Sequence, residues 1–269
     1  MSKLVGITIG TKNHLRPYIE TFTTPDTIPV AIPPFDFSEE EIQTKEASEK
    51  LDNIAGQLSE KLDALVLSGG EDISPVNYGQ NNLASFSCST ARDLTEVALV
   101  NAFTKKDKPI LGICRGYQIL GLMLGMSYFA QDLKEVKELH NGNEAELERN
   151  EPSHSVYVWG KFAEWMKEKG YSKDEEFVKM NVNSFHRQGF VFLPVSMKKV
   201  KEEKLSDFVQ KFTKDTDLEI IASTQAAVEG FCHKTKPILS AQWHPEVYPR
   251  SILIKYFFEE YLFAKPTGD

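Results

Sequence analysis

The chain has 269 residues, of which 41% are hydrophobic and 26% are charged, so it has enough apolar material for a globular core. A formal net charge of −8 argues against a general nucleic-acid-binding or anionic-membrane-binding surface. No apolar run is long enough to span a bilayer, and the N-terminus lacks the features of a signal peptide. The three widely spaced cysteines argue against a disulfide framework or a zinc site, so we expect a reducing, cytoplasmic setting.

The first half of the chain has the pattern of alternating strands and helices. Near-continuous apolar runs predict strands within residues 3–10, 27–35, 63–70 and 108–114. Helical spacing of leucine and isoleucine predicts a helix over residues 38–62, beginning at Ser38, and a second helix over residues 91–106. We therefore expect an α/β fold with a mostly parallel sheet covered by helices on both faces.

The second half is richer in short β-segments. Residues 153–160, 177–185, 218–223, 226–233 and 237–244 predict an antiparallel extension of the sheet. Residues 251–263 predict a closing amphipathic helix that packs on the core, whereas the charged stretches 134–150 and 198–217 predict surface loops or helices. Without a repeat or a linker, we expect one catalytic domain spanning residues 1–269.

Cys114 has the sequence context of a nucleophile. It follows an apolar strand, lies between Gly112 and Gly116, and precedes a helical pattern. Such spacing is typical of a sharp strand-to-helix turn that exposes the central side chain, and the helix N-terminus would stabilise negative charge on the sulfur. The alternative is a small core residue at a strand end. The Gly-x-Cys-x-Gly pattern alone does not decide between them.

A base for that thiol is found in the segment Gln242-Trp-His-Pro-Glu246. His244 ends an apolar strand, and Pro245 favours an extended backbone there. Residues at positions i and i+2 of an extended segment share a face, so Glu246 could orient the imidazole ring and stabilise its cation. The alternative is a surface turn with incidental charges.

These motifs together resemble the class I glutamine amidotransferase superfamily. "GICRGYQ" followed later by "QWHPE" matches its Cys–His–Glu order, while "GGEDISPVNYG" (residues 69–79) and "NSFHRQGF" (residues 183–190) resemble segments of the γ-glutamyl hydrolase branch. The resemblance spans residues 67–246. Within this branch it is nearest to the γ-glutamyl-γ-aminobutyrate hydrolase-like cysteine peptidases, and it implies a flavodoxin-like fold.

The resemblance implies a role for individual residues. Cys114 would be the nucleophile, His244 the base and acid, and Glu246 the residue that orients His244. The backbone amides of Gly70 and Arg115 would form an oxyanion hole, which suits a strand-end turn without a Cβ and the first residue of a helix. The residues implied to contact the substrate are Gln118, Ser184, Phe185 and His186.

Several other residues are expected to be structural. Asp72 and Tyr78 are expected to hold the 70–79 loop by turn hydrogen bonds, and Arg92 with Asp93 to act as a helix cap and charge pair. His154, His233, Cys88 and Cys232 are expected to be structural, and Gln118 and His186 have structural alternatives. Glu71 departs from the glycine often found at its position. If it faces the site, it would favour a cationic leaving group.

The resemblance favours a stand-alone hydrolase that cleaves γ-glutamyl amides through a thioester on Cys114, without a metal or an organic cofactor. The amine that leaves is not specified by the sequence. One alternative is a glutaminase subunit that supplies ammonia to a separate synthase, and another is a hydrolase of folate polyglutamate type. A third is a non-catalytic regulatory member of the fold. A small-molecule γ-glutamyl substrate is expected, with no nucleic acid or membrane partner, and a homodimer remains open.

Overall fold

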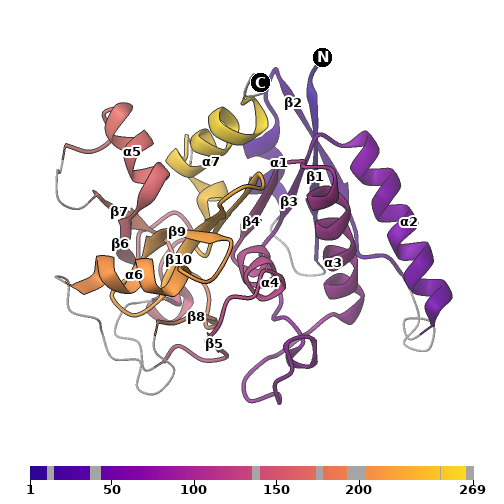
Figure 1. The fold of residues 1–269 in the computed structure, drawn as a ribbon, viewed down its shortest axis with the longest axis horizontal. Coiled ribbons are helices and arrows are strands. Elements are labelled where there is room, and N and C mark those ends of the chain that lie inside the picture. Colours follow the sequence, from indigo (N-terminus) through magenta and orange to yellow (C-terminus); the bar gives the residue numbers. More distant parts are fainter. Residues whose placement is uncertain are drawn as a thin grey trace.

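The computed structural model describes residues 1–10, 15–36, 44–134, 140–173, 178–192, 204–248 and 250–264. A nine-stranded sheet runs through these residues in the order β2-β1-β3-β4-β11-β10-β9-β6-β7 (Figure 1). Its strands are β1 (Lys3–Thr8), β2 (Thr27–Ile32), β3 (Ala64–Leu67), β4 (Ile110–Ile113), β6 (His154–Val158), β7 (Val178–Val182), β9 (Leu218–Ser223), β10 (Val228–His233) and β11 (Ile238–Ala241). A separate antiparallel pair consists of β5 (Phe129–Ala130) and β8 (Gly189–Phe190).

The sheet combines the two halves that the sequence predicts. Strands β2, β1, β3, β4 and β11 are parallel to one another, whereas β10, β9, β6 and β7 continue the sheet in antiparallel pairing. The mixed α/β fold is therefore confirmed.

Strand β11 corrects one part of the prediction. It pairs in parallel with β4, with Ala241 opposite Ile113, and is antiparallel only to β10. All four of its residues are buried, as is usual for a central strand covered on both faces. Because β4 and β11 run in the same direction, their carboxyl ends meet at one edge of the sheet.

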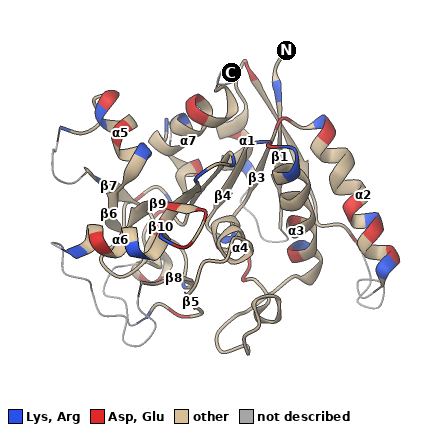
Figure 2. Cartoon of the chain, viewed as in Figure 1, with Lys and Arg blue, Asp and Glu red and all other residues tan. Residues whose placement is uncertain are grey.

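Helices cover both faces of the sheet. Packing on one face are α1 (Leu15–Phe22), α5 (Gly160–Glu168) and α7 (Ile252–Phe257). Packing on the other are α2 (Lys45–Lys61), α3 (Thr90–Lys105), α4 (Arg115–Met123) and α6 (Leu205–Thr213). Short 3₁₀ helices occur at Pro75–Tyr78, Gly142–Ala145 and Pro245–Val247, and a π-helical turn at Phe258–Leu262 follows α7. In Figure 2 the charged residues gather on the outer helices and loops, while the sheet is mostly uncharged.

The helix boundaries differ in part from those predicted. Helix α2 begins at Lys45, and the hydroxyl of Thr44 caps it by accepting the Ala47 amide at 3.2 Å. Ser38 lies outside the described residues, as do residues 135–139 and 198–203 of the two charged stretches. Helices α1 and α5 were not predicted. Among the described residues, no helix is long and apolar enough to cross a membrane.

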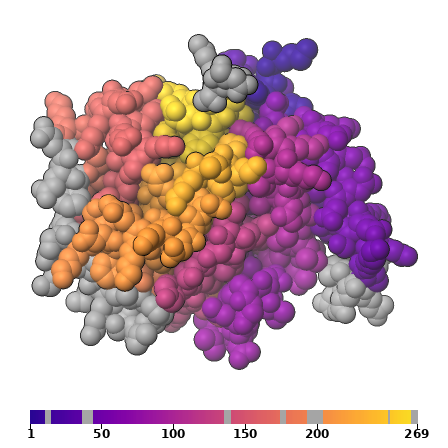
Figure 3. Space-filling model, in the orientation of Figure 1, coloured from indigo at the N-terminus to yellow at the C-terminus, as the bar shows by residue number. Residues whose placement is uncertain are grey.

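The C-terminal helix packs on the core as predicted, because Leu253, Ile254, Tyr256 and Phe257 of α7 are buried. In the space-filling view of Figure 3, the violet N-terminal elements and the orange elements near residue 210 lie on opposite sides of the molecule. Segments from the middle of the chain lie between them, which matches the central position of β4 in the sheet.

Candidate active site

Cys114 lies in a strained turn between β4 and α4. Its φ and ψ are 53° and −103°, in a region that non-glycine residues rarely adopt, and its side chain is almost buried. A Cβ on Gly116 would lie 2.2 Å from the carbonyl oxygen of Leu67, and one on Gly112 would lie 2.7 Å from the carbonyl oxygen of Gly116. The two glycines therefore allow β3, β4 and α4 to approach closely enough to form the turn.

His244 and Glu246 follow β11, the parallel neighbour of β4. The Nδ1 atom of His244 lies 2.7 Å from Oε1 of Glu246, and both side chains are buried. The His244 amide donates to Oδ1 of Asn183 at 3.1 Å, so the backbone here is also held. A Cβ placed on Gly69 would lie 2.9 Å from Cε1 of His244 and 3.5 Å from Cβ of Cys114. The structure thus brings the three residues predicted for the triad to the same edge of the sheet.

The electrostatics favour a charged imidazole in this group. Burial alone would lower the pKa of His244, but the Glu246 carboxylate and the neighbouring Cys114 side chain raise it to about 10. The ring is therefore an imidazolium at neutral pH. Because Nδ1 faces Glu246, the proton on Nε2 is the one available for transfer.

A small cavity of about 120 Å³ opens at Cys114. This is below the roughly 300–1,000 Å³ typical of pockets for drug-sized ligands, so it suits a small head group. Its lining residues come from four segments of the chain: Gly70, Asp72, Cys114, Arg115, Gln118, Asn141, Asn143, Phe185, His186, Arg187 and Gln188. Six of the nine predicted site residues therefore line this cavity, and a seventh, His244, lies beside Cys114.

Gly70 and Arg115 lie at the positions expected for oxyanion donors. Gly70 has a φ of 143° at the end of β3, and Arg115 is the first residue of α4. Among the described residues, no hydrogen bond is found from either backbone amide. Both amides are therefore available to a ligand in the cavity.

A buried charge network holds these two residues, and the sequence prediction did not include it. Arg92 donates to the carbonyl oxygens of Ser68 and Gly69, each at 2.9 Å, and to Oε2 of Glu71 at 2.9 Å. Glu96 accepts from Nε of Arg92 at 2.9 Å and from Nη1 of Arg115. The turn that contains Gly70 and the helix that begins at Arg115 are therefore joined through one carboxylate.

This network corrects the expectation for Arg92 and Asp93. The hydroxyl of Ser89 caps α3 by accepting the Arg92 amide at 3.3 Å. Asp93 is buried, pairs with Arg115, and accepts from the Ser74 amide at 3.1 Å and from Nδ2 of Asn77 at 2.6 Å. Asp93 therefore holds the 70–79 loop, the role that was expected of Asp72.

Glu71 and Asp72 point to different places. The Glu71 side chain is buried against Arg92 and does not line the cavity, so the expected extra charge in the pocket is wrong. Asp72 lines the cavity, where it accepts from the Phe86 amide at 3.0 Å and from Arg187 at 2.8 Å. Burial raises the pKa of Asp72, with the Phe86 amide and Arg187 opposing the shift. Tyr78 packs its ring edge-on against Phe129 instead of forming a turn bond.

The residues predicted to contact substrate divide into two groups. Gln118, Phe185 and His186 line the cavity, whereas Ser184 is buried behind it, with Oγ 3.1 Å from Nε2 of His186. Burial lowers the pKa of His186 to about 3 and outweighs the opposing charge of Glu229, so this ring is neutral. Nε2 of Gln118 donates to the Gln188 carbonyl at 3.0 Å, which fixes its amide.

None of the remaining histidines and cysteines that the structure describes lines the cavity. Nδ1 of His233 accepts from the amides of Thr235 and Lys236, a structural turn as expected. Burial raises the pKa of Cys232 to about 11, which suits an inert core thiol. Cys88 is exposed and does not line the cavity, so its expected lack of a catalytic role stays a prediction.

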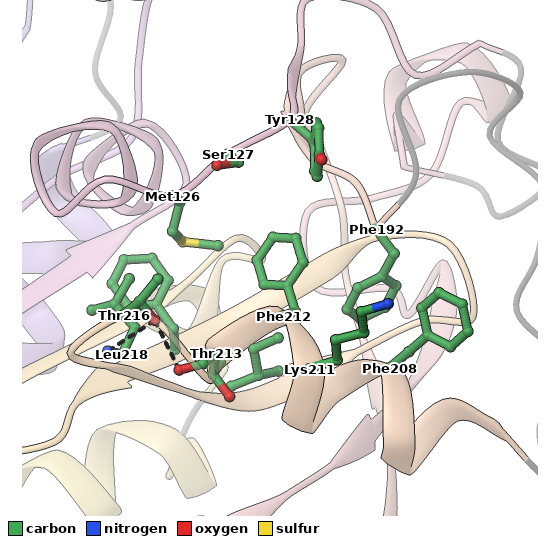
Figure 4. A pocket seen from close by; sticks show the side chains of 12 residues that line it. Met126, Ser127, Tyr128, Phe192, Phe208, Lys211, Phe212, Thr213, Thr216 and Leu218 are labelled. Carbon is green, nitrogen blue, oxygen red and sulfur yellow. Dashed lines mark hydrogen bonds between the residues drawn. The ribbon is translucent and has the colours of Figure 1, made fainter.

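A second cavity of about 290 Å³ lies between α6, the strands β9 and β10, and the residues that precede β5 and follow β8 (Figure 4). In the close-up, the rings of Phe208 and Phe212 project from α6 beside Phe192, and Lys211 is the charged residue at this wall. None of the residues predicted for catalysis lines it. The polar cavity at Cys114 is therefore the candidate active site.

The fold and this strand-end site define a class I glutamine amidotransferase-like protein. The crystal structure of a GMP synthase subunit protein from Thermoplasma acidophilum superimposes with a TM-score of 0.53 at 18% sequence identity, covering 96% of this chain and 92% of that one. The chain matches the Peptidase C26 family over residues 9–246 and belongs to it, which indicates a hydrolase.

Two relatives are similar to this chain in sequence. The glutamine amidotransferase-like protein YvdE of Lactococcus lactis subsp. lactis is 30% identical over 202 residues, which is 74% of this chain and 71% of the relative. The γ-glutamyl-γ-aminobutyrate hydrolase of Escherichia coli O157:H7 is 34% identical over 106 residues, which is 38% of this chain and 41% of the relative. Together these support a role of the γ-glutamyl hydrolase or glutaminase type.

Proposed function

We propose that the protein hydrolyses the γ-glutamyl amide of a small molecule through a thioester on Cys114. The observation that carries this proposal is the pairing of β4 with β11. It places a strained, nearly buried cysteine beside an imidazolium that is held by a carboxylate. The relative named γ-glutamyl-γ-aminobutyrate hydrolase supports the same substrate class.

In the first half of the reaction, the Cys114 sulfur attacks the side-chain carbonyl carbon of the γ-glutamyl group. The negative charge that develops on the carbonyl oxygen is stabilised by the amides of Gly70 and Arg115. As the C–N bond breaks, the nitrogen takes the Nε2 proton of His244, and a neutral amine leaves. Because His244 is already charged, it acts first as an acid, and it acts as a base only in the second half of the reaction.

In the second half, the neutral ring of His244 takes a proton from water, and the resulting hydroxide attacks the thioester carbon. The C–S bond breaks with the electron pair going to sulfur, so Cys114 leaves as a thiolate and His244 is an imidazolium again. The product leaves as a γ-carboxylic acid and loses its remaining proton to solvent. Glu246 keeps its carboxylate on Nδ1 throughout and holds the ring toward the sulfur. The amide of Gln118 lies one helical turn from Cys114, where it would contact the glutamyl group.

The proposal is tested with a panel of γ-glutamyl amides. The panel contains glutamine, γ-glutamyl-γ-aminobutyrate, a γ-glutamyl diamine and a diglutamate, and glutamate release is followed for each. We expect turnover by the isolated protein and a glutamyl adduct on Cys114 detectable by mass spectrometry of the quenched enzyme. Cys114→Ala should lose at least about a thousandfold in kcat, whereas Cys88→Ser, which changes an exposed thiol, should be unaffected.

Two outcomes would redirect the assignment. Full hydrolysis by Cys114→Ala would remove the proposed nucleophile. Turnover of glutamine alone, slow without a synthase and faster with one, would favour the ammonia-donating role instead. Cytoplasmic location and a homodimer also stay predictions, to be measured by fractionation and by light scattering.

A further inference from the structure

Three side chains with metal-binding atoms meet behind the wall of the Cys114 cavity. Nδ1 of His140 lies 3.2 Å from Oε1 of Glu229, and Nε2 of His154 lies 3.9 Å from Oε2 of the same carboxylate. One ligand atom from each residue lies within 4.8 Å of the other two. His154 begins β6 and Glu229 lies in β10, with β9 between the two strands.

Buried polar atoms of Glu229 and His140 lack hydrogen-bond partners among the described residues. Glu229 is fully buried, and among the described residues neither of its oxygens accepts a hydrogen bond that meets normal geometry. The same holds for both ring nitrogens of the buried His140. A buried carboxylate without donors is costly unless a cation or protons neutralise it.

His186 lies beside the cluster but is satisfied elsewhere. Its ring centroid is 5.1 Å from that of His140, and its Nε2 is 3.9 Å from Oε2 of Glu229. However, its nitrogens already lie at 2.9 Å from the Gln188 carbonyl and 3.1 Å from the Ser184 hydroxyl. His186 therefore serves as a wall between the cluster and the cavity and is not counted as a ligand.

We propose that His140, His154 and Glu229 bind a divalent transition metal ion, with zinc as the best fit. Two imidazole nitrogens and one carboxylate oxygen are the ligand types that zinc takes, with a fourth position left for water. Bonds of about 2.0–2.2 Å at tetrahedral angles put neighbouring donor atoms roughly 3.3 Å apart. The His140–Glu229 pair already has this spacing. Rotation of the His154 ring toward Glu229 would shorten the distance between its Nε2 atom and the carboxylate to the same range.

The position suggests a structural ion that stiffens the substrate wall. The His140 carbonyl accepts the His186 amide at 2.9 Å, and the next residue, Asn141, forms a β-bridge with Phe185. These two segments supply Asn141, Phe185 and His186 to the cavity. An ion bound here would cross-link β6, β10 and the wall segment. The inference stands independently of the substrate proposed above.

The test measures metal uptake directly, in a protein whose reactive thiols are removed. In the variant Cys88→Ser/Cys114→Ala, zinc cannot bind these two thiols, so titration against a chromophoric chelator reports the cluster. We expect one equivalent of zinc, confirmed by elemental analysis, and a Co²⁺ spectrum with intense tetrahedral bands. Adding Glu229→Gln should weaken binding at least about tenfold, whereas adding His233→Gln, a histidine outside the cluster, should leave it unchanged.

Since Glu229 is buried, its replacement can prevent folding, so a second measurement uses the unaltered cluster. Zinc should raise the melting temperature of the Cys88→Ser/Cys114→Ala protein in proportion to the logarithm of the zinc concentration. The proposal is overturned if this protein takes up less than one equivalent and melts at the same temperature with and without zinc. It is equally overturned if His233→Gln weakens binding as much as Glu229→Gln.

Discussion

The Arg92 guanidinium donates from Nη2 to the carbonyl oxygen of Gly69 at 2.9 Å, one residue before the amide proposed for the oxyanion hole. The same guanidinium is fully buried and bound by the carboxylates of Glu71 and Glu96. A rigid cation therefore fixes the backbone turn that would stabilise the reacting oxygen. Changes at this turn and around it should alter both the stability and the activity of the protein.

Replacing Arg92 by alanine should destabilise the protein strongly. The change removes the guanidinium that pairs with the buried Glu71 and takes one donor each from Glu96 and from two carbonyl oxygens, a loss that costs about 3–5 kcal/mol in comparable cases. Urea unfolding measures this loss of unfolding free energy. The value of kcat should fall as well, because the Gly70 turn loosens. The matched control is Arg16→Ala, whose ion pair with Glu20 is exposed, and its unfolding should be nearly unchanged. Equal effects of the two changes would contradict a structural role for the buried network.

Gly116→Ala should disrupt the turn that carries Cys114. The new methyl group would lie 2.2 Å from the carbonyl oxygen of Leu67, so α4 must move away from β3. We expect a loss of about 1–3 kcal/mol in unfolding free energy or more, together with most of the activity. Gly56→Ala in α2 meets nothing within 4 Å and should stabilise by about 0.5–1 kcal/mol. An active, stable Gly116→Ala would show that the close approach is not required.

The pH dependence of hydrolysis should reveal the Glu246–His244 pair. Above the His244 pKa of about 10, the imidazolium loses the proton that the leaving amine needs, so kcat/KM should fall there. Glu246→Gln removes the carboxylate that raises this pKa, and the alkaline limb should move toward the ordinary histidine value near 6.5. We expect kcat at pH 7 to drop about a hundredfold or more. An alkaline limb at the same pH in both proteins would exclude this assignment.

Leaving-group preference should depend on Asp72 and not on Glu71. Asp72 pairs with Arg187 at the cavity, so Asp72→Asn frees a positive charge there and should raise kcat/KM for anionic leaving groups relative to cationic ones. Glu71→Gln changes a carboxylate that faces Arg92 and should leave the preference unchanged while lowering stability. A shift of preference in Glu71→Gln would restore the interpretation drawn from the sequence alone.

Much of the fold was predictable because apolar runs identify buried strands directly. β1, β3 and β4 lie within the predicted segments. The direction of β11 was not predictable, since its apolar pattern fits a buried strand in either orientation. α1 and α5 were missed although both have apolar residues at helical spacing, because each is short, with eight and nine residues, and so spans too few turns for the periodicity to stand out.

The parts of the candidate site that could be predicted are the reactive residues that lie in short sequence motifs. Cys114, His244 and Glu246 belong to such motifs, and the structure brings them together, although their catalytic roles stay predictions. The buried charged residues that hold this site in place were not predictable. Arg92 and Asp93 have the composition of a solvated helix start, and only the fold buries them. Local sequence does not specify which distant carboxylate a buried arginine will meet.

The placement of β11 has a consequence for how the protein reaches its native state. This strand is inserted between β4 and β10, and its partner β4 is distant in the sequence, so their pairing closes a long loop. Until that happens β4 is an exposed, apolar edge, open to pairing with other chains. Cys114 donates its amide to the Ala241 carbonyl at 2.9 Å, so the reactive turn is anchored in the same late step. A nascent chain that still lacks β11 would therefore have its cysteine without the strand that anchors it and without His244, the proposed proton donor, at the stage when β4 is open to aggregation.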